Sequence, residues 1–306
     1  MCKESVIIPR KLVAGDLIGI AAPASPFDTA EFASGAAVLE SMGFRLTIPG
    51  GIYRRRGYLA GSDFERAELL NGLFENRQVK AIICARGGFG STRLLQYLDY
   101  ESIKKNPKIF VGFSDITAIL SALYTNCGLV TWHGPMVTTL GQADRATLES
   151  LRSVLLSGSN FELKPKNGLV MQKGFAAGPV AGGNLSTLCS LLGTPAQPDY
   201  KYRILFLEDR GEAPYRIDRM LTQMKQAGCF ESLAGLILGS FEGCGEYNEV
   251  LEIFADIIRE FDFPVMSGFE AGHGKTNITI PMGLAARLDT DKKTLSFGRV
   301  ATSFAE

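Results

Sequence analysis

Residues 79–95 read VKAIICARGGFGSTRLL, and this stretch decides the fold class. Its first half, 79–85, is a nearly unbroken apolar run, which is typical of a strand covered by helices on both faces. The glycine loop RGGFG follows at 86–90, and residues 91–98 then read as a helix. A strand, a short loop and a helix in this order indicate a βαβ unit, and such units build parallel sheets.

The same alternation extends on both sides of this unit, from residue 16 to about residue 155. Strands are expected at 16–24, 44–48, 108–113 and 128–133, and helices at 28–42, 65–74 and 116–127. Ser62 and Glu65 have the spacing of a capping box, which marks the start of a helix. The pattern predicts a parallel sheet with helices on both faces, whose active site lies outside the carboxyl ends of the strands.

The character of the sequence changes near Ser157. The segment SGSNFELKPKNG, at 157–168, is rich in the residues of loops and domain boundaries. Beyond it, strands are expected at 176–181, 201–207, 236–241, 278–288 and 294–300, and helices at 185–192, 215–227 and 248–260. A chain of 306 residues is long enough for about two domains. We expect an N-terminal α/β domain over 1–160 and a smaller, β-rich α+β domain over 170–306.

Composition narrows the classes of function. Lys+Arg and Asp+Glu number 32 each, so no net charge attracts nucleic acid, and we expect no such partner. No run approaches the roughly 20 apolar residues of a membrane span. AAPAS at 21–25 resembles a signal cleavage site, but Arg10, Lys11 and Asp16 interrupt the apolar segment that a signal peptide needs. These features predict a cytoplasmic protein without a membrane partner.

Cysteine and histidine usage bears on metal and redox chemistry. None of the six cysteines forms a CxxC pair, and most read as small buried apolar residues. Only two histidines are present, His133 and His273, which excludes a zinc site of three histidines. We therefore expect neither a metal nor a cofactor.

The strongest local signal for catalysis is GFSDIT at 112–117. Ser114 stands at the junction of a strand and a helix, where a nucleophile elbow exposes its serine. The backbone N–H of Asp115, at the start of that helix, is free to stabilise an oxyanion. The match to G-x-S-x-G is partial, because Ile116 replaces the second glycine. A plain helix N-cap is the alternative role for Ser114.

The glycine loop 86–90 is a second candidate. Its glycines allow the backbone to approach a ligand closely and to turn N–H groups, including that of Gly88, toward an oxyanion. The loop lacks the GxGxxG spacing of a dinucleotide site and the GK[ST] of a P-loop. The alternative is a plain turn at the end of a strand.

A serine nucleophile needs a base, and the base needs a carboxylate to orient it. His273 lies in the polar, glycine-flanked loop FEAGHGKTN and is favoured over His133, which follows Trp132 and suits a structural role equally well. Glu208 lies at the end of the apolar strand ILFLED, where a carboxylate is aimed at a site, whereas most acids of this chain lie on helix faces. The alternative for this acid is a solvated strand end paired with a nearby arginine. The order Ser114, Glu208, His273 also occurs in α/β-hydrolases.

With these motifs in hand, the chain resembles the LD-carboxypeptidase family of serine peptidases, the S66 type. The motifs that carry the resemblance are GDLIGIAAPAS at 15–25, GYLAG at 57–61, ARGGFGSTRLL at 85–95, GFSDIT at 112–117, TWHGPM at 131–136, GGNLSTL at 182–188, LFLEDRGEAPYRIDRML at 205–221 and GHGKTNITIPMG at 272–283. They occur in order along nearly the whole chain, which makes the resemblance far more specific than the elbow alone.

The resemblance implies a triad of Ser114, His273 and Glu208, with the backbone N–H groups of Gly88 and Asp115 as the oxyanion hole. It implies a flavodoxin-like or Rossmann-like N-terminal domain, a homodimer, and a small peptide substrate, a cytoplasmic murein tetrapeptide. The expected reaction is release of the terminal D-alanine from its bond to an L-configured centre during cell-wall recycling.

Two substrate contacts and three rival functions complete the expectations. A carboxypeptidase recognises a free carboxylate, and Arg86 beside the glycine loop suits that task. Asn184 is a second candidate contact, with a helix N-cap as its alternative. The microcin C immunity-type relatives share the triad but cleave aminoacyl-nucleotide analogues on an aromatic platform, for which the single Trp132 gives no clear support. A non-enzymatic anion-binding module and a cysteine-nucleophile enzyme are the other two rivals, and no cysteine occupies an elbow.

Overall fold

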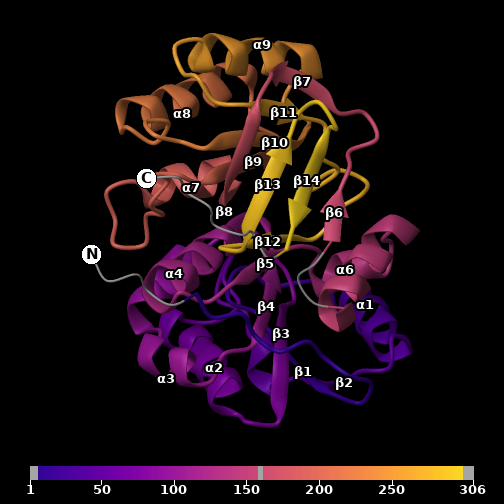
Figure 1. Ribbon diagram of the computed structural model, residues 1–306. Helices are drawn as coiled ribbons and strands as arrows, with labels where there is room; N and C mark the ends of the chain where they lie inside the picture. Colours follow the sequence, from indigo (N-terminus) through magenta and orange to yellow (C-terminus); the bar gives the residue numbers. More distant parts are fainter. Residues whose placement is uncertain (1–5, 158–160, 299–306) are drawn as a thin grey trace.

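The computed structural model of the chain describes residues 6–157 and 161–298, and its strands form two sheets (Figure 1). The first half of the chain builds the lower sheet in that view, and most of the second half builds the upper one. The expected α/β architecture, a parallel-sheet N-terminal region followed by a second sheet region, is confirmed. No helix within 6–157 or 161–298 combines the length and hydrophobicity needed to cross a membrane.

The first sheet has six strands in the order β12-β5-β4-β3-β1-β2. Its strands are β1 (Leu17–Ala21), β2 (Arg45–Thr47), β3 (Val79–Cys84), β4 (Ile109–Gly112), β5 (Thr131–His133) and β12 (Ile280–Met282). The first five run parallel, as the alternation of strands and helices predicts, and β12 pairs antiparallel with β5. All five carboxyl ends of the parallel strands therefore meet at one edge.

Helices cover both faces of this sheet (Figure 1). One face carries α1 (Thr29–Ser41), α5 (Val137–Leu140) and α6 (Arg145–Ser157), and the other carries α2 (Asp63–Glu75), α3 (Tyr100–Lys105) and α4 (Thr117–Cys127). The predicted capping box is present: the Ser62 hydroxyl accepts from the Glu65 N–H, and Glu65 Oε2 accepts from the Ser62 N–H. The 3₁₀ helices are η1 (Gly50–Tyr53), η2 (Thr92–Tyr97) and η3 (Ser114–Ile116).

The segment after the glycine loop differs from its prediction. Residues 91–98 were expected to form an α-helix, but the structure has the short 3₁₀ helix η2. It ends at Tyr97, and Leu98 is extended, because Asp99 already caps the next helix by accepting from the Ser102 N–H at 2.9 Å.

The second sheet has eight strands in the order β6-β14-β13-β8-β9-β10-β11-β7. Its strands are β6 (Phe161–Leu163), β7 (Leu169–Gln172), β8 (Phe175–Asn184), β9 (Ile204–Arg210), β10 (Gly235–Glu242), β11 (Val265–Ser267), β13 (Ala285–Asp289) and β14 (Thr294–Phe297). The four strands β8 to β11 run parallel, and the rest pair antiparallel. Strands β6, β7 and β11 are additions to the predicted set.

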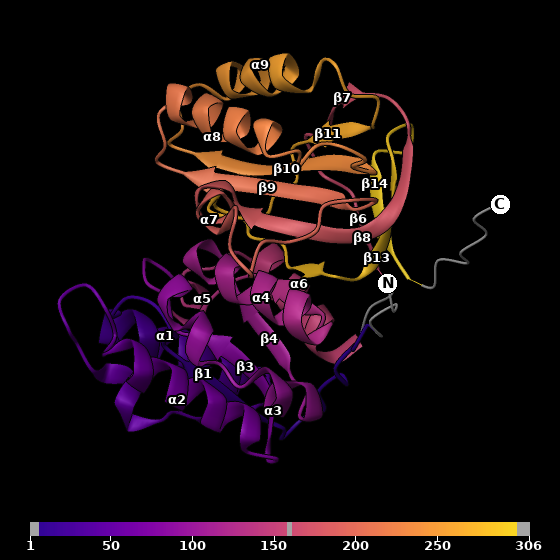
Figure 2. The ribbon, with the colours of Figure 1, turned by 90° about the vertical axis from the view of Figure 1, so that its left-hand side faces the viewer.

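Three helices cover one face of this sheet, as Figure 2 shows: α7 (Leu185–Leu191), α8 (Pro214–Gln226) and α9 (Tyr247–Ile258). Each lies within two residues of its predicted bounds. The opposite face belongs to a continuous apolar cluster that includes Phe206 and Ile237 of this sheet, Val111 of the first sheet and Leu151 of α6. The two sheets therefore share a core.

The predicted strand 278–288 is wrong as a single element. The structure divides it into β12, which joins the first sheet, and β13, which joins the second. Pro281 is tolerated in β12 because that strand lies at the edge of its sheet. The division into domains at 1–160 and 170–306 stays a prediction, and 158–160 and 299–306, with the end of the predicted strand 294–300, lie outside the described residues.

Candidate active site

The junction after β4 places Ser114 in an unusual backbone conformation. Its φ angle is 61°, in the left-handed region that non-glycine residues rarely adopt. Such a conformation costs on the order of 1–3 kcal/mol and is found mainly at functional sites. The hydroxyl caps no helix, since neither η3 nor α4 has a side-chain hydrogen bond at its N-cap. Ser114 instead lines an open cavity of about 650 Å³.

That cavity brings together most of the residues singled out from the sequence. Its wall contains Ser114, Gly88 and His273, together with Arg86 and Arg210. Ser114 comes from the first sheet region, and His273 follows β11 of the second, so the cavity lies where the two regions meet. Within 6–157 and 161–298, no three His, Cys, Asp or Glu side chains come together in a way that suits a metal ion.

The glycine loop presents a free backbone donor to the cavity. Gly88 has a φ angle of +105°, and no hydrogen bond between described residues occupies its N–H. A Cβ at this position would lie 2.4 Å from Ser25 Oγ, so only glycine fits. The Ser25 hydroxyl accepts from the Phe89 N–H at 3.1 Å, which fastens the loop to the segment after β1.

The side chain of Asp115 ties the glycine loop to the elbow. Its Oδ2 accepts from the Ser91 N–H at 2.8 Å, and its carbonyl accepts from the Ser91 hydroxyl. Burial raises the pKa of the Asp115 carboxyl in spite of these hydrogen bonds. The N–H of Asp115 lies at the start of η3, where the first amides have no acceptor inside the helix. Both predicted oxyanion donors are thus held in one connected unit.

Arg66 is a further part of this unit that the sequence did not reveal. The side chain is 2% exposed and projects from α2 between two loops. Its Nη1 donates to the carbonyls of Pro23 and, at 2.9 Å, Gly90, while its Nη2 donates to Asp63 at 2.6 Å. Pro23 lies 43 residues and Gly90 24 residues away along the chain, so no local pattern could indicate this contact.

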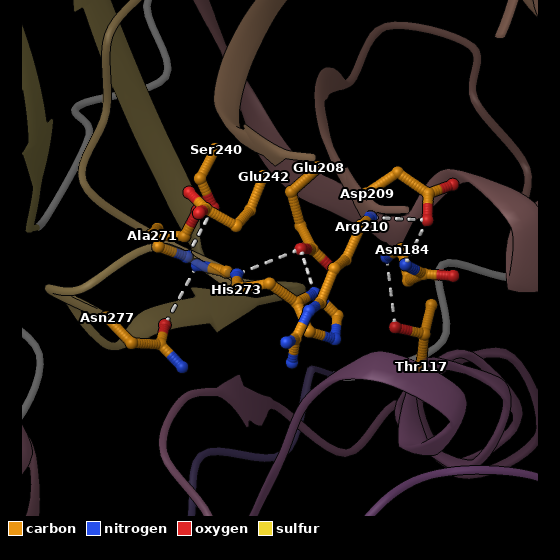
Figure 3. A network of polar contacts seen from close by, with 12 residues as sticks. Thr117, Asn184, Glu208, Asp209, Arg210, Ser240, Glu242, Ala271, His273 and Asn277 are labelled. Carbon is orange, nitrogen blue, oxygen red and sulfur yellow. Dashed lines mark hydrogen bonds and ion pairs between the residues drawn. The ribbon is translucent and has the colours of Figure 1, made fainter. Parts of the chain in front are cut away.

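Glu208 and His273 are in direct contact (Figure 3). Glu208 Oε2 lies 2.7 Å from His273 Nδ1 and accepts from the His273 N–H at 3.2 Å. The carboxylate is fully buried at the end of β9. Because it accepts at Nδ1, the proton of the neutral imidazole is held there, and Nε2 is left free to take a proton.

His133 lies on the other side of the same carboxylate. Its Nε2 is 3.6 Å from Glu208 Oε1, and the side chain is fully buried and absent from the cavity wall. Burial alone would raise the pKa of Glu208, but the imidazoles of His133 and His273 outweigh it and lower the pKa to about 2. The two imidazoles therefore favour the ionised form of Glu208.

The loop that carries His273 is fastened at several points. The Ser240 hydroxyl accepts from the Gly274 N–H at 2.9 Å, and Asn277 Oδ1 accepts from the Gly272 N–H at 2.9 Å (Figure 3). The Asn277 N–H in turn donates to Thr147 of α6 at 2.9 Å. These bonds hold the histidine against the first sheet region.

The two predicted substrate contacts have different surroundings. Arg86 lines the cavity, and its Nη1 donates to the Pro26 carbonyl at 2.9 Å. Asn184 is absent from the cavity wall and is the N-cap of α7, accepting from the Thr187 N–H at 3.0 Å. Its Nδ2 donates to Asp209 at 3.0 Å (Figure 3). The structure thus gives Asn184 the role of an N-cap, and a substrate contact there stays a prediction.

Comparison with known proteins relates this geometry to a family. The family models of the LD-carboxypeptidase N-terminal and C-terminal domains match residues 18–134 and 177–288. A probable murein peptide carboxypeptidase of Bacillus subtilis is 39% identical over 94% of this chain and 92% of its own length.

Two solved structures are also similar. An MccF-like protein of Bacillus anthracis overlays with a TM-score of 0.90 and 28% identity, over 95% of this chain and 99% of its own. A muramoyltetrapeptide carboxypeptidase of Oxalobacter formigenes overlays with a TM-score of 0.82 and 31% identity, over 94% and 100%. Two family models that cover most of the chain, and a relative of this identity over nearly all of it, establish that the chain belongs to the LD-carboxypeptidase family.

Proposed function

We propose that this protein is a serine carboxypeptidase that releases the terminal D-alanine from murein tetrapeptides. The observation that carries the proposal is the cavity in which a strained Ser114 and a carboxylate-bound His273 meet. The names of the Bacillus subtilis and Oxalobacter formigenes relatives support the choice of a muropeptide substrate.

In this mechanism, Ser114 is the nucleophile and His273 the general base. The Ser114 hydroxyl attacks the carbonyl of the last peptide bond, and its proton passes to Nε2 of His273. Glu208 holds Nδ1 and stabilises the imidazolium that forms. The amine of D-alanine leaves with that proton, and a water molecule, activated in the same way, hydrolyses the acyl-enzyme.

Stabilisation of the developing oxyanion accelerates the reaction. The N–H groups of Gly88 and Asp115 are the proposed donors, and each such donor is worth about 10²–10³ in kcat. Both belong to backbone that is held rigidly by Ser91 and Arg66, so little reorganisation accompanies the reaction.

Recognition of the substrate's free carboxylate falls to the arginines of the cavity. Arg86 is the proposed partner, and its guanidinium suits a planar, bidentate contact. Arg210 lines the same cavity and is a second cation within it. Replacement of either by leucine should raise KM for the tetrapeptide more than it lowers kcat.

The decisive experiment is mass spectrometry of the products from tripeptide, tetrapeptide and pentapeptide muropeptides. We expect the wild-type protein to release D-alanine only from the tetrapeptide. The Ser114→Ala variant should stay folded and should turn over none of the three peptides. Undiminished turnover by Ser114→Ala would overturn the proposal. Strong inhibition by EDTA would contradict the expectation that the reaction needs no metal.

The alternative is a microcin C immunity-type hydrolase that cleaves aminoacyl-nucleotide analogues. The overlay with the MccF-like protein favours it, and MccF of Escherichia coli is described as a microcin C7 self-immunity protein. Against it stands Trp132, which is 6% exposed within the core and offers no platform for a nucleobase. A parallel assay with an aminoacyl-sulfamoyl adenylate separates the two functions.

Two further properties belong to the proposal. A muropeptide salvaged from the cell wall is met in the cytoplasm, and we place the protein there. We also propose a homodimer, which sedimentation of the purified protein tests.

A further inference from the structure

Two imidazoles flank the carboxylate of Glu208, and the proposed triad uses only one of them. His273 binds Oε2 at 2.7 Å, whereas His133 approaches Oε1 from the opposite side at 3.6 Å. Glu208 Oε1 and both ring nitrogens of His133 are buried and have no hydrogen-bond partner among the described residues. These atoms need an explanation, because unpaired buried polar atoms are costly and rare.

The surroundings of His133 offer no other partner. Its ring packs edge-on against Phe113, with centroids 5.9 Å apart, and against Phe206 at 5.0 Å. Its backbone pairs with Gly112 on one side and Ile280 on the other. A movement of about half an ångström would bring Nε2 and Oε1 to ordinary hydrogen-bond distance.

We propose that His133 is a positioning residue that donates a hydrogen bond from Nε2 to Glu208 Oε1, so that two imidazoles hold the carboxylate. This inference rests on the proposed function of Glu208 and His273. With Oε1 held, the carboxylate cannot rotate, and Oε2 stays directed at His273 Nδ1.

The second hydrogen bond also changes the charge balance of the site. Donation to Oε1 withdraws charge from the carboxylate, which then attracts a protonated His273 less strongly. The other charged groups near Glu208 are its chain neighbours Asp209, which binds Asn184 and Ser186, and Arg210, which lines the cavity. Neither faces His133 in a hydrogen bond or ion pair.

The test compares two variants of His133. His133→Gln places an amide nitrogen near the position of Nε2 and keeps the donor, whereas His133→Phe fills the space without one. We measure kcat/KM for the tetrapeptide against pH, since its acid limb reports the protonation of the free enzyme's base. We expect the limb to move up by about one pH unit in His133→Phe and to return to the wild-type position in His133→Gln. Equal limbs in all three proteins, or equal displacement in both variants, would overturn the proposal.

A second measurement does not depend on activity. The chain has only two histidines, so the ¹⁵N-imidazole spectrum of the inactive Ser114→Ala variant contains only two rings. We expect a protonated Nε2 on His133 whose signal changes on Glu208→Gln, and an unprotonated Nε2 would refute the contact. Turnover by Ser114→Ala would instead refute the proposed function and leave this result standing. The spectrum also decides the question if His133→Phe does not fold.

Discussion

Arg66 offers the sharpest test of how the fold supports the proposed oxyanion hole. Its guanidinium joins the Pro23 and Gly90 carbonyls and binds Asp63, and it is buried almost completely. Arg66→Met keeps an apolar stem of similar length but removes every donor. The Pro23 carbonyl then loses its partner, the Gly90 carbonyl keeps only the Arg93 N–H at 3.3 Å, and Asp63 keeps only its contact with the Arg93 guanidinium.

The magnitude follows from those contacts. An unsatisfied buried acceptor costs about 1–3 kcal/mol, so the orphaned Pro23 carbonyl should lower the free energy of unfolding by about that amount. The glycine loop loses one of its anchors, the Arg66 contact at Gly90, and kcat should fall at least 10-fold as the Gly88 N–H leaves its position, since one oxyanion donor is worth about 10²–10³. KM should change little, because Arg86 and Arg210 are untouched.

Urea unfolding and steady-state kinetics on the tetrapeptide measure the two effects separately. Arg93→Met is the matched control. The Arg93 guanidinium binds the same Asp63 carboxylate, with Nη2 2.9 Å from Oδ2. The side chain is 45% exposed, however, and its guanidinium touches neither loop. An exposed ion pair is worth at most about 1 kcal/mol. The reasoning is refuted if Arg66→Met is no less stable than Arg93→Met, or if it keeps the wild-type kcat.

Three further predictions concern single side chains. Gly88→Ala should reduce kcat about 10²-fold in tetrapeptide kinetics because its Cβ would meet Ser25; Gly57→Ala, with φ +60° in open space, is the control, and an equal loss there would contradict this. The pKa of Glu208 falls from 4.5 in the unfolded chain to about 2 in the folded one, so the stabilisation by its carboxylate is present above pH 4.5 and is lost as the pH falls toward 2. Urea titrations should therefore show the stability difference between wild type and Glu208→Gln shrinking over that range. A constant difference would disprove this. Burial lowers the pKa of Lys108 from 10.5 to about 8, so the unfolded state binds more protons than the folded state between these pH values. In the same assay, wild type should therefore gain stability relative to Lys108→Met as the pH rises from 8 to 10.5.

Much of the fold could be predicted because its signals are local. The apolar run at 79–85 and the capping box at Ser62 each depend on neighbours in the sequence, and the structure has a strand and a helix there. The same holds for α7, α8 and α9, whose bounds the sequence pattern approximates closely. Strand β12 could not be predicted, because its membership of the first sheet depends on pairing with β5, about 150 residues earlier.

In the candidate site, too, the features with local sequence signals could be predicted and those that depend on distant contacts could not. Ser114 and Gly88 each follow a strand of the first sheet, so the carboxyl edge of that sheet is expected to gather them, and the structure brings both into one cavity with His273. Arg66 and Ser91 act on that cavity through contacts far apart in sequence, which no local pattern indicates. For His133, the sequence is compatible with both a catalytic base and a structural residue. Its burial beside Glu208 is what favours the structural role.

The crossing of β12 into the first sheet has a consequence for dissecting the protein. A fragment that ends near residue 157 would leave β5 as an open edge, with the unpaired backbone of Trp132 and His133 exposed to other chains. Such a fragment should self-associate in solution. A synthetic peptide spanning 270–289 carries both His273 and the missing strand, and it should compete for that edge by strand addition. In the intact chain, β12 covers that edge for the half of the chain that carries Ser114.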